Sequence, residues 1–486
     1  MSVRRLGIAQ AVVAASVLVA CEAPPRPCAV DGDCFAGTSC SGGGLCVAEC
    51  ESHGACAAAR GAGSFCDFRG RCAGGVSSAG DVGTTGATDA GVADAGPRAL
   101  DAEAEVMLVP RGSTPTHFGA GIAVSADGSR ALIGAGADDT AAENGGCARV
   151  FSRFGTAWVE EAVLVASSAA RNEWLGTSVA LSADGSRALV GAVGVAWELA
   201  GSARVFVRSD AGWTEEARLS AGDATVGDLF GFSVALSADG DRALVGAYYD
   251  DVGGVEDAGS ARVFARTGAS WTEEAMLVAA DAAEHELFGM SVALSADGSR
   301  AVVGVVFDNG VGRAGGGRVF VRDGTRWTEE TALISSSLDT IALGESSAMS
   351  ADGTIAVLGG VQGAVVFVRD AQGWIEEAAL RPADATSLDR FGSSVAVSAD
   401  GRRALVGGEF DDTTAGEDAG SARVFDRGAG GWTEGPILLA PDGAPTDWFG
   451  RRVALAGDGR LAVVGAPEDD TAAGLNGGSA WVFRLP

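Results

Sequence analysis

The sequence predicts an all-β protein whose largest part, residues 105–486, is a seven-bladed β-propeller of four-stranded antiparallel blades. A Phe-Gly pair, or Leu-Gly in two copies, recurs seven times at intervals of 48 to 58 residues. Each copy carries one Asp-Gly between two short apolar runs, and two further runs of strand type follow. Four short strands repeated at this period are typical of a propeller, whereas the coils of a β-solenoid are much shorter. The pairs begin at Phe118, Leu175, Phe230, Phe288, Leu343, Phe391 and Phe449.

The repeat at residues 230–277 illustrates how each blade is expected to form. Its first two strands, SVALS and RALVG, flank Asp239-Gly240. Apolar runs around Asp-Gly predict a hairpin whose two central residues both have positive φ. A loop rich in Gly and Asp leads to the third strand, SARVF, and the fourth strand begins at Trp271.

The last repeat lacks a fourth strand, because the chain ends at Pro486 directly after the third-strand text AWVFRL. Residues 105–108 (EVML) resemble the fourth-strand text EEAML and precede the first Phe-Gly. Blades in a ring are stabilised mainly by their neighbours, so we expect residues 105–109 to complete the last blade.

Phe-Gly followed about fifteen residues later by Gly-Ala resembles the FG-GAP repeat of integrin α-chain propellers and related bacterial surface proteins. Gly465-Ala466-Pro467 is the complete second motif. In the integrin family some repeats carry a DxDxDG-type calcium loop between the two motifs, but this chain has SADGS or a variant there. One carboxylate cannot supply the six to eight oxygen ligands of calcium, so we do not expect calcium at that loop. A kelch-like propeller is the alternative resemblance and has the same architecture.

Strand order puts the loops between second and third strands on the same face as the connections between blades. Both kinds of loop are acidic, whereas arginines flank the hairpin turns of the opposite face, so we expect one acidic and one Arg-rich face. The acidic residues either cap their own turns or bind a divalent cation, for which calcium is the candidate. The candidate ligands are Asp228, Asp250, Asp251, Asp389, Asp411, Asp412, Asp447, Asp469 and Asp470. The arginines beside the hairpin turns are Arg130, Arg187, Arg242, Arg300, Arg403 and Arg460, with Arg208, Arg266, Arg322, Arg369 and Arg427 near the other turns of that face.

One Trp begins the fourth strand in six repeats, which favours a role in blade packing over a sugar-binding platform. Pairs of Glu follow, such as Glu215-Glu216, opposite third-strand arginines such as Arg204. We interpret these as cross-strand ion pairs on the outer edge of the blade.

Residues 1–20 are predicted to be a lipoprotein signal peptide. Arg4 and Arg5 precede an apolar run of ten residues that is too short to span a bilayer. It ends in Leu-Val-Ala-Cys, which resembles the lipobox of bacterial lipoproteins and implies that Cys21 is lipid-modified, with residues 21–27 as a tether. A plain secretory signal is the alternative. Glu22 after the cysteine favours the outer membrane or the cell surface over inner-membrane retention.

Residues 28–72 are predicted to be a small disulfide module of two units. Their eight cysteines have a duplicated spacing, and an even number of cysteines behind a signal peptide indicates disulfides. A zinc site would need CxxC-type pairs, which are absent from the segment. The connectivity stays open. The cysteines are Cys28, Cys34, Cys40, Cys46, Cys50, Cys56, Cys66 and Cys72. Residues 73–104, rich in Gly, Ala, Ser, Thr and Asp, are predicted to be a flexible linker, and Cys147 a buried residue of the propeller.

Composition narrows the function. A net charge of -29 argues against nucleic-acid binding. The chain has only three His, which argues against a metal site or catalytic cluster built from histidines. His285, Trp197 and Tyr248-Tyr249 break the repeat but are isolated in the sequence. We expect a lipid-anchored, surface-displayed binding or adhesion module, not an enzyme, that recognises a protein or glycan through a propeller face. The alternatives are a structural envelope lipoprotein without a ligand, and a propeller hydrolase or lyase, which a non-repeating carboxylate cluster at the channel mouth would favour.

Overall fold

The computed structural model describes residues 102–110, 116–194, 199–307, 315–336, 342–386, 388–471 and 474–486, and four short strands before them. The chain divides into two compact units, Met1–Asp94 and Ala95–Pro486. In the described part of the chain, no helix is long and apolar enough to cross a membrane.

The described residues of the first unit form two short hairpins with a cysteine pair at each. β1 (Thr38–Cys40) pairs with β2 (Cys46–Ala48), so that Cys40 lies opposite Cys46. β3 (Phe65–Cys66) pairs with β4 (Cys72–Ala73), so that Cys66 lies opposite Cys72. The other four cysteines of the predicted disulfide module, and Cys21 with its signal peptide, lie outside the described residues, so these assignments stay predictions.

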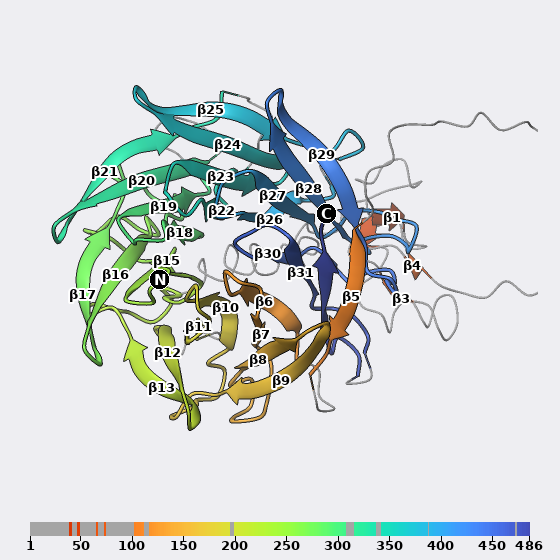
Figure 1. Ribbon diagram of the computed structural model, residues 1–486, viewed down its shortest axis with the longest axis horizontal. Coiled ribbons are helices and arrows are strands. Elements are labelled where there is room, and N and C mark those ends of the chain that lie inside the picture. The colour runs from red at the N-terminus through yellow and green to blue at the C-terminus, as the bar shows by residue number, and fades with distance from the viewer. Residues whose placement is uncertain are drawn as a thin grey trace, which may run out of the picture. The chain divides into compact units, whose positions relative to one another are not determined.

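The described residues of Ala95–Pro486 form seven four-stranded antiparallel sheets, arranged as the blades of a propeller (Figure 1). Blades 1 and 2 contain β6 (Phe118–Val124), β7 (Arg130–Ala135), β8 (Cys147–Phe154), β9 (Ala157–Leu164), and β10 (Leu175–Leu181), β11 (Arg187–Ala192), β12 (Ser202–Ser209), β13 (Gly212–Leu219). Blades 3 and 4 contain β14 (Ser233–Leu236), β15 (Arg242–Ala247), β16 (Ser260–Thr267), β17 (Ser270–Leu277), and β18 (Val292–Leu294), β19 (Arg300–Val305), β20 (Gly316–Asp323), β21 (Arg326–Leu333). Blades 5 and 6 contain β22 (Ser346–Met349), β23 (Ile355–Gly360), β24 (Gly363–Asp370), β25 (Gly373–Leu380), and β26 (Phe391–Val397), β27 (Arg403–Gly408), β28 (Ser421–Gly428), β29 (Gly431–Leu438).

Blade 7 is built from both ends of the propeller sequence, as expected. β30 (Arg452–Leu455), β31 (Leu461–Ala466) and β32 (Ser479–Arg484) are joined by β5 (Glu103–Leu108), which pairs with β32. Figure 1 shows β5 at the outer edge of the propeller, in the position that β9 and β13 occupy in their own blades. The ring is therefore closed by a strand that begins two residues before the predicted one.

The middle strands of each blade are buried on both faces, because every blade packs between two others. In β15 and β16 of blade 3, almost every residue from Ala243 to Phe264 that lies in a strand is inaccessible to water. This double burial explains why RALVG and SARVF read as nearly continuous apolar runs. The first strands lie nearest the axis and contact each other around the ring (Figure 1).

The Asp-Gly turns differ from the predicted type. Gly128 has φ of 68°, but Asp127 is not among the residues with positive φ, and the N–H of Gly128 donates to the carbonyl of Ser125. This is a type I turn followed by a left-handed Gly. Asp127 has another task, since its carboxylate accepts the backbone N–H of Ser129 at 2.9 Å and so caps the turn.

The glycines of the repeat are where adjacent blades touch. Gly289, in the Phe-Gly of blade 4, has φ of +95°, and a Cβ there would lie 2.3 Å from the carbonyl oxygen of Ser260 in blade 3. Gly246 in β15 would place a Cβ 2.1 Å from the carbonyl oxygen of Gly289. Only residues without a side chain allow this backbone contact, so both motifs of the repeat serve the same interface.

In blades 1 to 5, a Glu in the fourth strand joins the blade to the next one. Glu216 accepts hydrogen bonds from Arg187 of its own blade and from Arg266 and Trp271 of blade 3, the latter two at 3.0 Å. The role of the Trp series in blade packing is thereby confirmed. The same arrangement recurs around Glu161, Glu274 and Glu330.

The expectation of an Arg-rich face is therefore wrong for most of these arginines. Their side chains cross the blade interface, where carboxylates neutralise them, and Arg187 is buried. Burial alone would raise the pKa of Glu161, but Arg208, Ser152 and Arg130 outweigh it and lower the pKa to about 2. These ion pairs belong to the structural frame of the ring.

Candidate functional site

The aspartates of blade 3 are bonded to the protein's own groups. Asp250 contacts the buried Arg262 at 3.1 Å, and Asp251 accepts the backbone N–H of Asp257 at 2.9 Å. Asp228 caps its own turn by accepting the N–H of the residue three positions earlier, at 2.6 Å. The sequence predicts an ion pair between Arg262 and Glu273 on the outer edge of the blade. The two side chains do form an ion pair, but the guanidinium of Arg262 is buried.

Blade 6 repeats this pattern. Asp411 contacts Arg423 at 3.1 Å, Asp412 accepts the N–H of Asp418 at 3.0 Å, and Asp389 caps its own turn. These contacts correspond to turn capping and ion pairing. In the described ranges, no group of three or more His, Cys, Asp or Glu side chains is placed to hold a metal ion.

Blade 7 has no arginine at the equivalent third-strand position, where Trp481 stands instead. Asp447 and Asp469 are buried there, while Asp470 accepts the N–H of Asn476 at 3.0 Å. Burial raises the pKa of Asp447 to about 6, and the charge of Asp469 adds to this effect. Blade 7 thus carries more uncompensated acid than blades 3 and 6.

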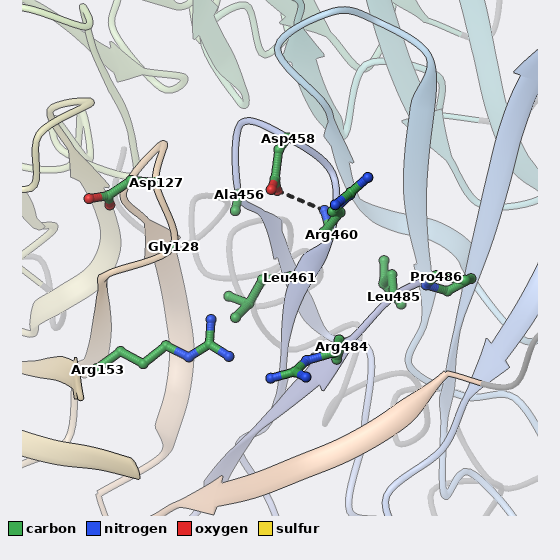
Figure 2. Close-up of a pocket in the computed structure, with 10 residues that line it drawn as sticks. All are labelled: Asp127, Gly128, Arg153, Ala456, Asp458, Arg460, Leu461, Arg484, Leu485 and Pro486. Atoms are coloured by element: carbon green, nitrogen blue, oxygen red, sulfur yellow. Dashed lines mark hydrogen bonds between the residues drawn. The ribbon is translucent and has the colours of Figure 1, made fainter. Parts of the chain in front are cut away.

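A pocket of about 540 Å³ lies at the closure of the ring, among the hairpin turns (Figure 2). Figure 2 shows Arg153 and Arg484 extending toward each other below Leu461. Both guanidinium groups contact the carboxylate of Glu105, at 3.0 and 2.6 Å. Through these contacts, Arg153 ties the closing strand to blade 1 and Arg484 ties it to β32.

The first strand of each blade lies nearest the axis, and the residue before each Phe-Gly or Leu-Gly lies at the start of that strand. This end is on the face that carries the loops between second and third strands. We call these seven residues the rim. All seven have φ between 49° and 58°, although none is Gly. Left-handed backbone in non-Gly residues is costly and is concentrated at functional sites. The rim residues are His117, Trp174, Leu229, Leu287, Ala342, Arg390 and Trp448.

Five charged side chains gather at the rim of blades 5, 6 and 7. Arg390 contacts Glu409 at 3.1 Å and also forms an ion pair with Glu345. Arg451 contacts Glu409 at 2.6 Å. Arg452 donates to the backbone carbonyl of Arg451 at 2.9 Å. We call these five residues the charged cluster.

Aromatic rings hold two of the arginines in the charged cluster. The guanidinium of Arg451 lies 5.2 Å from the centre of the Trp448 ring, and that of Arg390 lies 5.9 Å from the centre of Phe410. The two rings contact each other edge to face with centroids 5.4 Å apart. Cation–π contacts of this kind add to the ion pairs and fix the positions of the side chains.

The pKa values of the two glutamates in the charged cluster shift in opposite directions. Burial raises the pKa of Glu345. Arg390 opposes this effect, whereas the negative charge of Glu409 adds to it. Burial would also raise the pKa of Glu409, but Arg451 and Arg390 outweigh it and lower the value. Burial, followed by the charge of Arg451, lowers the pKa of Arg452 to about 10.

The isolated residues that the sequence singled out have other positions. Tyr248 and Tyr249 are buried and stack with centroids 4.4 Å apart, which is a packing role. His285 lies 3.0 Å from Asp257 in the connection to blade 4, and Trp197 lies outside the described residues. Cys147 is a free, fully buried thiol, as predicted, and burial raises its pKa.

Sequence reasoning missed the charged cluster, although a signal was present. When the seven repeats are aligned on Phe-Gly, the second following residue is Ser in five copies and Arg452 in the seventh. The first following residue is uncharged in five copies, but it is Glu345 in the fifth and Arg451 in the seventh. Comparison of repeats by position, rather than a search for motifs, would have found these residues.

The comparison with known families agrees with this architecture. A family model described as FG-GAP repeat matches residues 158–206, 213–264, 271–321, 374–425 and 432–483, just over half of the chain. Each matched segment runs from the Trp of one blade's fourth strand to the third strand of the next blade. A search of curated proteins finds no match.

Proposed function

Because the chain belongs to the FG-GAP repeat family, we propose that it is a binding module that recognises a protein or glycan at the rim of its propeller. A propeller of this family is consistent with ligand binding, and the rim is where specificity for one ligand can arise. Residues at the interfaces between blades repeat, since they have the same task in each blade. Leu229 and Leu287 of the rim are buried, whereas the other five rim residues keep the same backbone conformation, are partly exposed and differ in chemistry.

That contrast is the observation that carries the proposal. A purely structural ring needs no departure from its repeat at the axis. Here the departures include His117 beside Trp174, with ring centroids 6.4 Å apart, and the charged cluster with Phe410 and Trp448. Aromatic residues and Arg are the residue types enriched at binding hot spots.

We further propose that lipid on Cys21 anchors the protein in the bacterial envelope, at the outer membrane or the cell surface. The course of β5 supports display of the rim. Glu103 lies opposite Arg484, so the chain enters the propeller at the face of the hairpin turns. The described part of the chain thus begins at the face opposite the rim.

A hydrolase or lyase is the second candidate, and one observation favours it. Glu345 and Glu409 form a non-repeating pair of carboxylates whose pKa values shift apart, as in an acid and base pair. Each, however, is in an ion pair with an arginine, which opposes proton donation. Ligand binding is thus the better-supported function.

Arrays of glycans and of surface proteins, probed with the full mature chain, test the binding proposal. A rim variant with His117→Ala, Trp174→Ala and Trp448→Ala should lose at least tenfold in affinity for whatever the wild type binds. Arg460→Ser, on the opposite face, is the matched control and should bind like the wild type. Binding that survives the rim variant, or no binding by the wild type, would contradict the proposal and favour a structural protein.

Anchoring is tested separately. Wild type and Cys21→Ser are expressed with radioactive palmitate and the envelope is fractionated. The wild type should be labelled and sediment with membranes, whereas the variant should be unlabelled. Label in the Cys21→Ser variant would refute lipidation at this residue.

A further inference from the structure

Arg452 occupies a position that has a defined structural role in other blades. Ser233 and Ser291 at that position donate to the Phe-Gly or Leu-Gly carbonyl of the next blade, both at 2.8 Å. Ser178 and Ser346 do the same in their blades. Arg452 gives up this bond between blades, so its side chain has another use.

The charged cluster has one positive charge in excess. Three guanidinium groups, of Arg390, Arg451 and Arg452, face two carboxylates, of Glu345 and Glu409. Among the described residues, no carboxylate lies within 4.0 Å of Arg452, and its guanidinium donates to a backbone carbonyl instead. Arg452 is half-buried, and Glu409 and Glu345 act on its charge only from beyond ion-pair distance, so an anionic group of a ligand can pair with its guanidinium.

A carboxylate is the anionic group that matches Arg452 best in geometry. The planar guanidinium presents parallel N–H donors that match the two oxygens of a carboxylate. Arg390 and Arg451 are already held by Glu409 and by aromatic rings, so they form a fixed wall beside Arg452.

The surroundings determine what carries that carboxylate. Exposed acids lie on the loops of the same face, including Asp412, Asp442 and Asp470, and the whole chain has a charge of -29. A densely anionic ligand is repelled there, whereas a ligand with one carboxylate among many hydroxyl groups can donate hydrogen bonds to these acids. The half-buried ring of Trp448 offers an apolar face for a sugar ring.

From this arrangement we propose that Arg452 binds the carboxylate of a sugar acid, with Trp448 packing against the sugar ring. The inference rests on the proposed function, because it names the ligand class of the same rim. An acidic glycan with spaced uronate residues is the expected ligand, and an acidic peptide is the competing one.

Titration calorimetry on the full mature chain tests it, with an α-1,4-linked trimer of two galactose residues and one galacturonic acid as the probe. The methyl ester of the same trimer is the matched ligand without charge, and tri-glutamate is the peptide arm. Arg452→Ser restores the residue of the other blades and should keep the melting temperature. It should weaken binding of the acid trimer by roughly 10–100-fold, the usual cost of a charged hydrogen bond.

Arg460→Ser should bind like the wild type. Equal binding by Arg452→Ser, equal binding of the methyl ester, or binding of tri-glutamate alone would each overturn the inference. No binding of any probe by the wild type, together with rim-dependent binding on the arrays, would refute the sugar-acid ligand but not the binding function. Trp448→Ala provides a second variant, and unchanged binding by it would refute the role given to the ring.

Discussion

Glu105 allows the closure of the ring to be tested by one substitution. Its carboxylate, 9% exposed, meets Arg153 of blade 1 through both oxygens at 3.0 Å and Arg484 at 2.6 Å. Arg484 is 54% exposed, so that its contact contributes at most about 1 kcal/mol. Arg153 is 22% exposed, and removing the partner of such an enclosed charge costs about 3 kcal/mol.

Glu105→Ala should therefore destabilise the propeller by about 3 kcal/mol. For a domain of this length the entropy of unfolding is roughly 0.8 kcal/mol/K, so the melting temperature should fall by about 4 °C. Thermal unfolding followed by circular dichroism on the full chain measures this. Glu103→Ala is the matched control, because Glu103 is exposed on the same strand and should change stability by less than about 0.5 kcal/mol.

A double-mutant cycle with Arg153→Ala assigns the effect to this pair. A coupling energy of about 2 kcal/mol is expected, since the two side chains share one contact. If Glu105→Ala melts within about 1 °C of Glu103→Ala, or if the coupling energy is near zero, the closing strand is not held by this ion pair and the reasoning fails.

Three further predictions concern closure, titration and blade contact. Deletion of residues 105–109 should lower the melting temperature by many degrees, because blade 7 then loses its fourth strand; an unchanged melting curve would contradict the closure. Asp447 in the folded protein keeps its proton up to about pH 6, whereas the unfolded chain releases it near pH 4, so its ionisation costs stability as pH rises between these values and fully above them. Asp447→Asn should therefore raise the melting temperature at about pH 7.5 and hardly at about pH 4, and an equal effect at both would refute the assignment. Gly289→Ala should lower the free energy of unfolding, measured in urea, by more than about 3 kcal/mol, because the new Cβ would meet the Ser260 carbonyl. Gly268→Ala, also at positive φ but in open space, should lower it by only about 1 kcal/mol. Similar costs at both sites would show that the blades do not touch there.

The fold could be predicted from the sequence because the same pattern of strands and turns recurs seven times. The strands, their order and the closing strand all follow from local patterns of apolar residues and turns. The predicted turn type, with positive φ at both central residues, is wrong. Asp-Gly also suits a type I turn followed by a left-handed Gly, and no local rule separates these two turn types. The cap that Asp127 makes is visible only in three dimensions.

The charge arrangement could not be predicted in the same way. The position of an arginine along its own strand says nothing about the neighbouring blade, where Glu216 neutralises Arg266. The charged cluster is assembled from three blades, with Glu345 and Arg452 more than a hundred positions apart in the sequence. Only the geometry of the ring brings such residues together.

The closing strand also sets the order of events when the protein is made. β5 is the first strand of the propeller to be synthesised, and its partner β32 is the last. Until then β5 has no sheet to join, and the edge of β32's blade cannot be covered. The contact is among the most distant in the sequence, so ring closure should be the slow, final step of folding. Charged residues on β5, such as Glu103 and Glu105, suit a strand that must wait in solution without pairing to another chain.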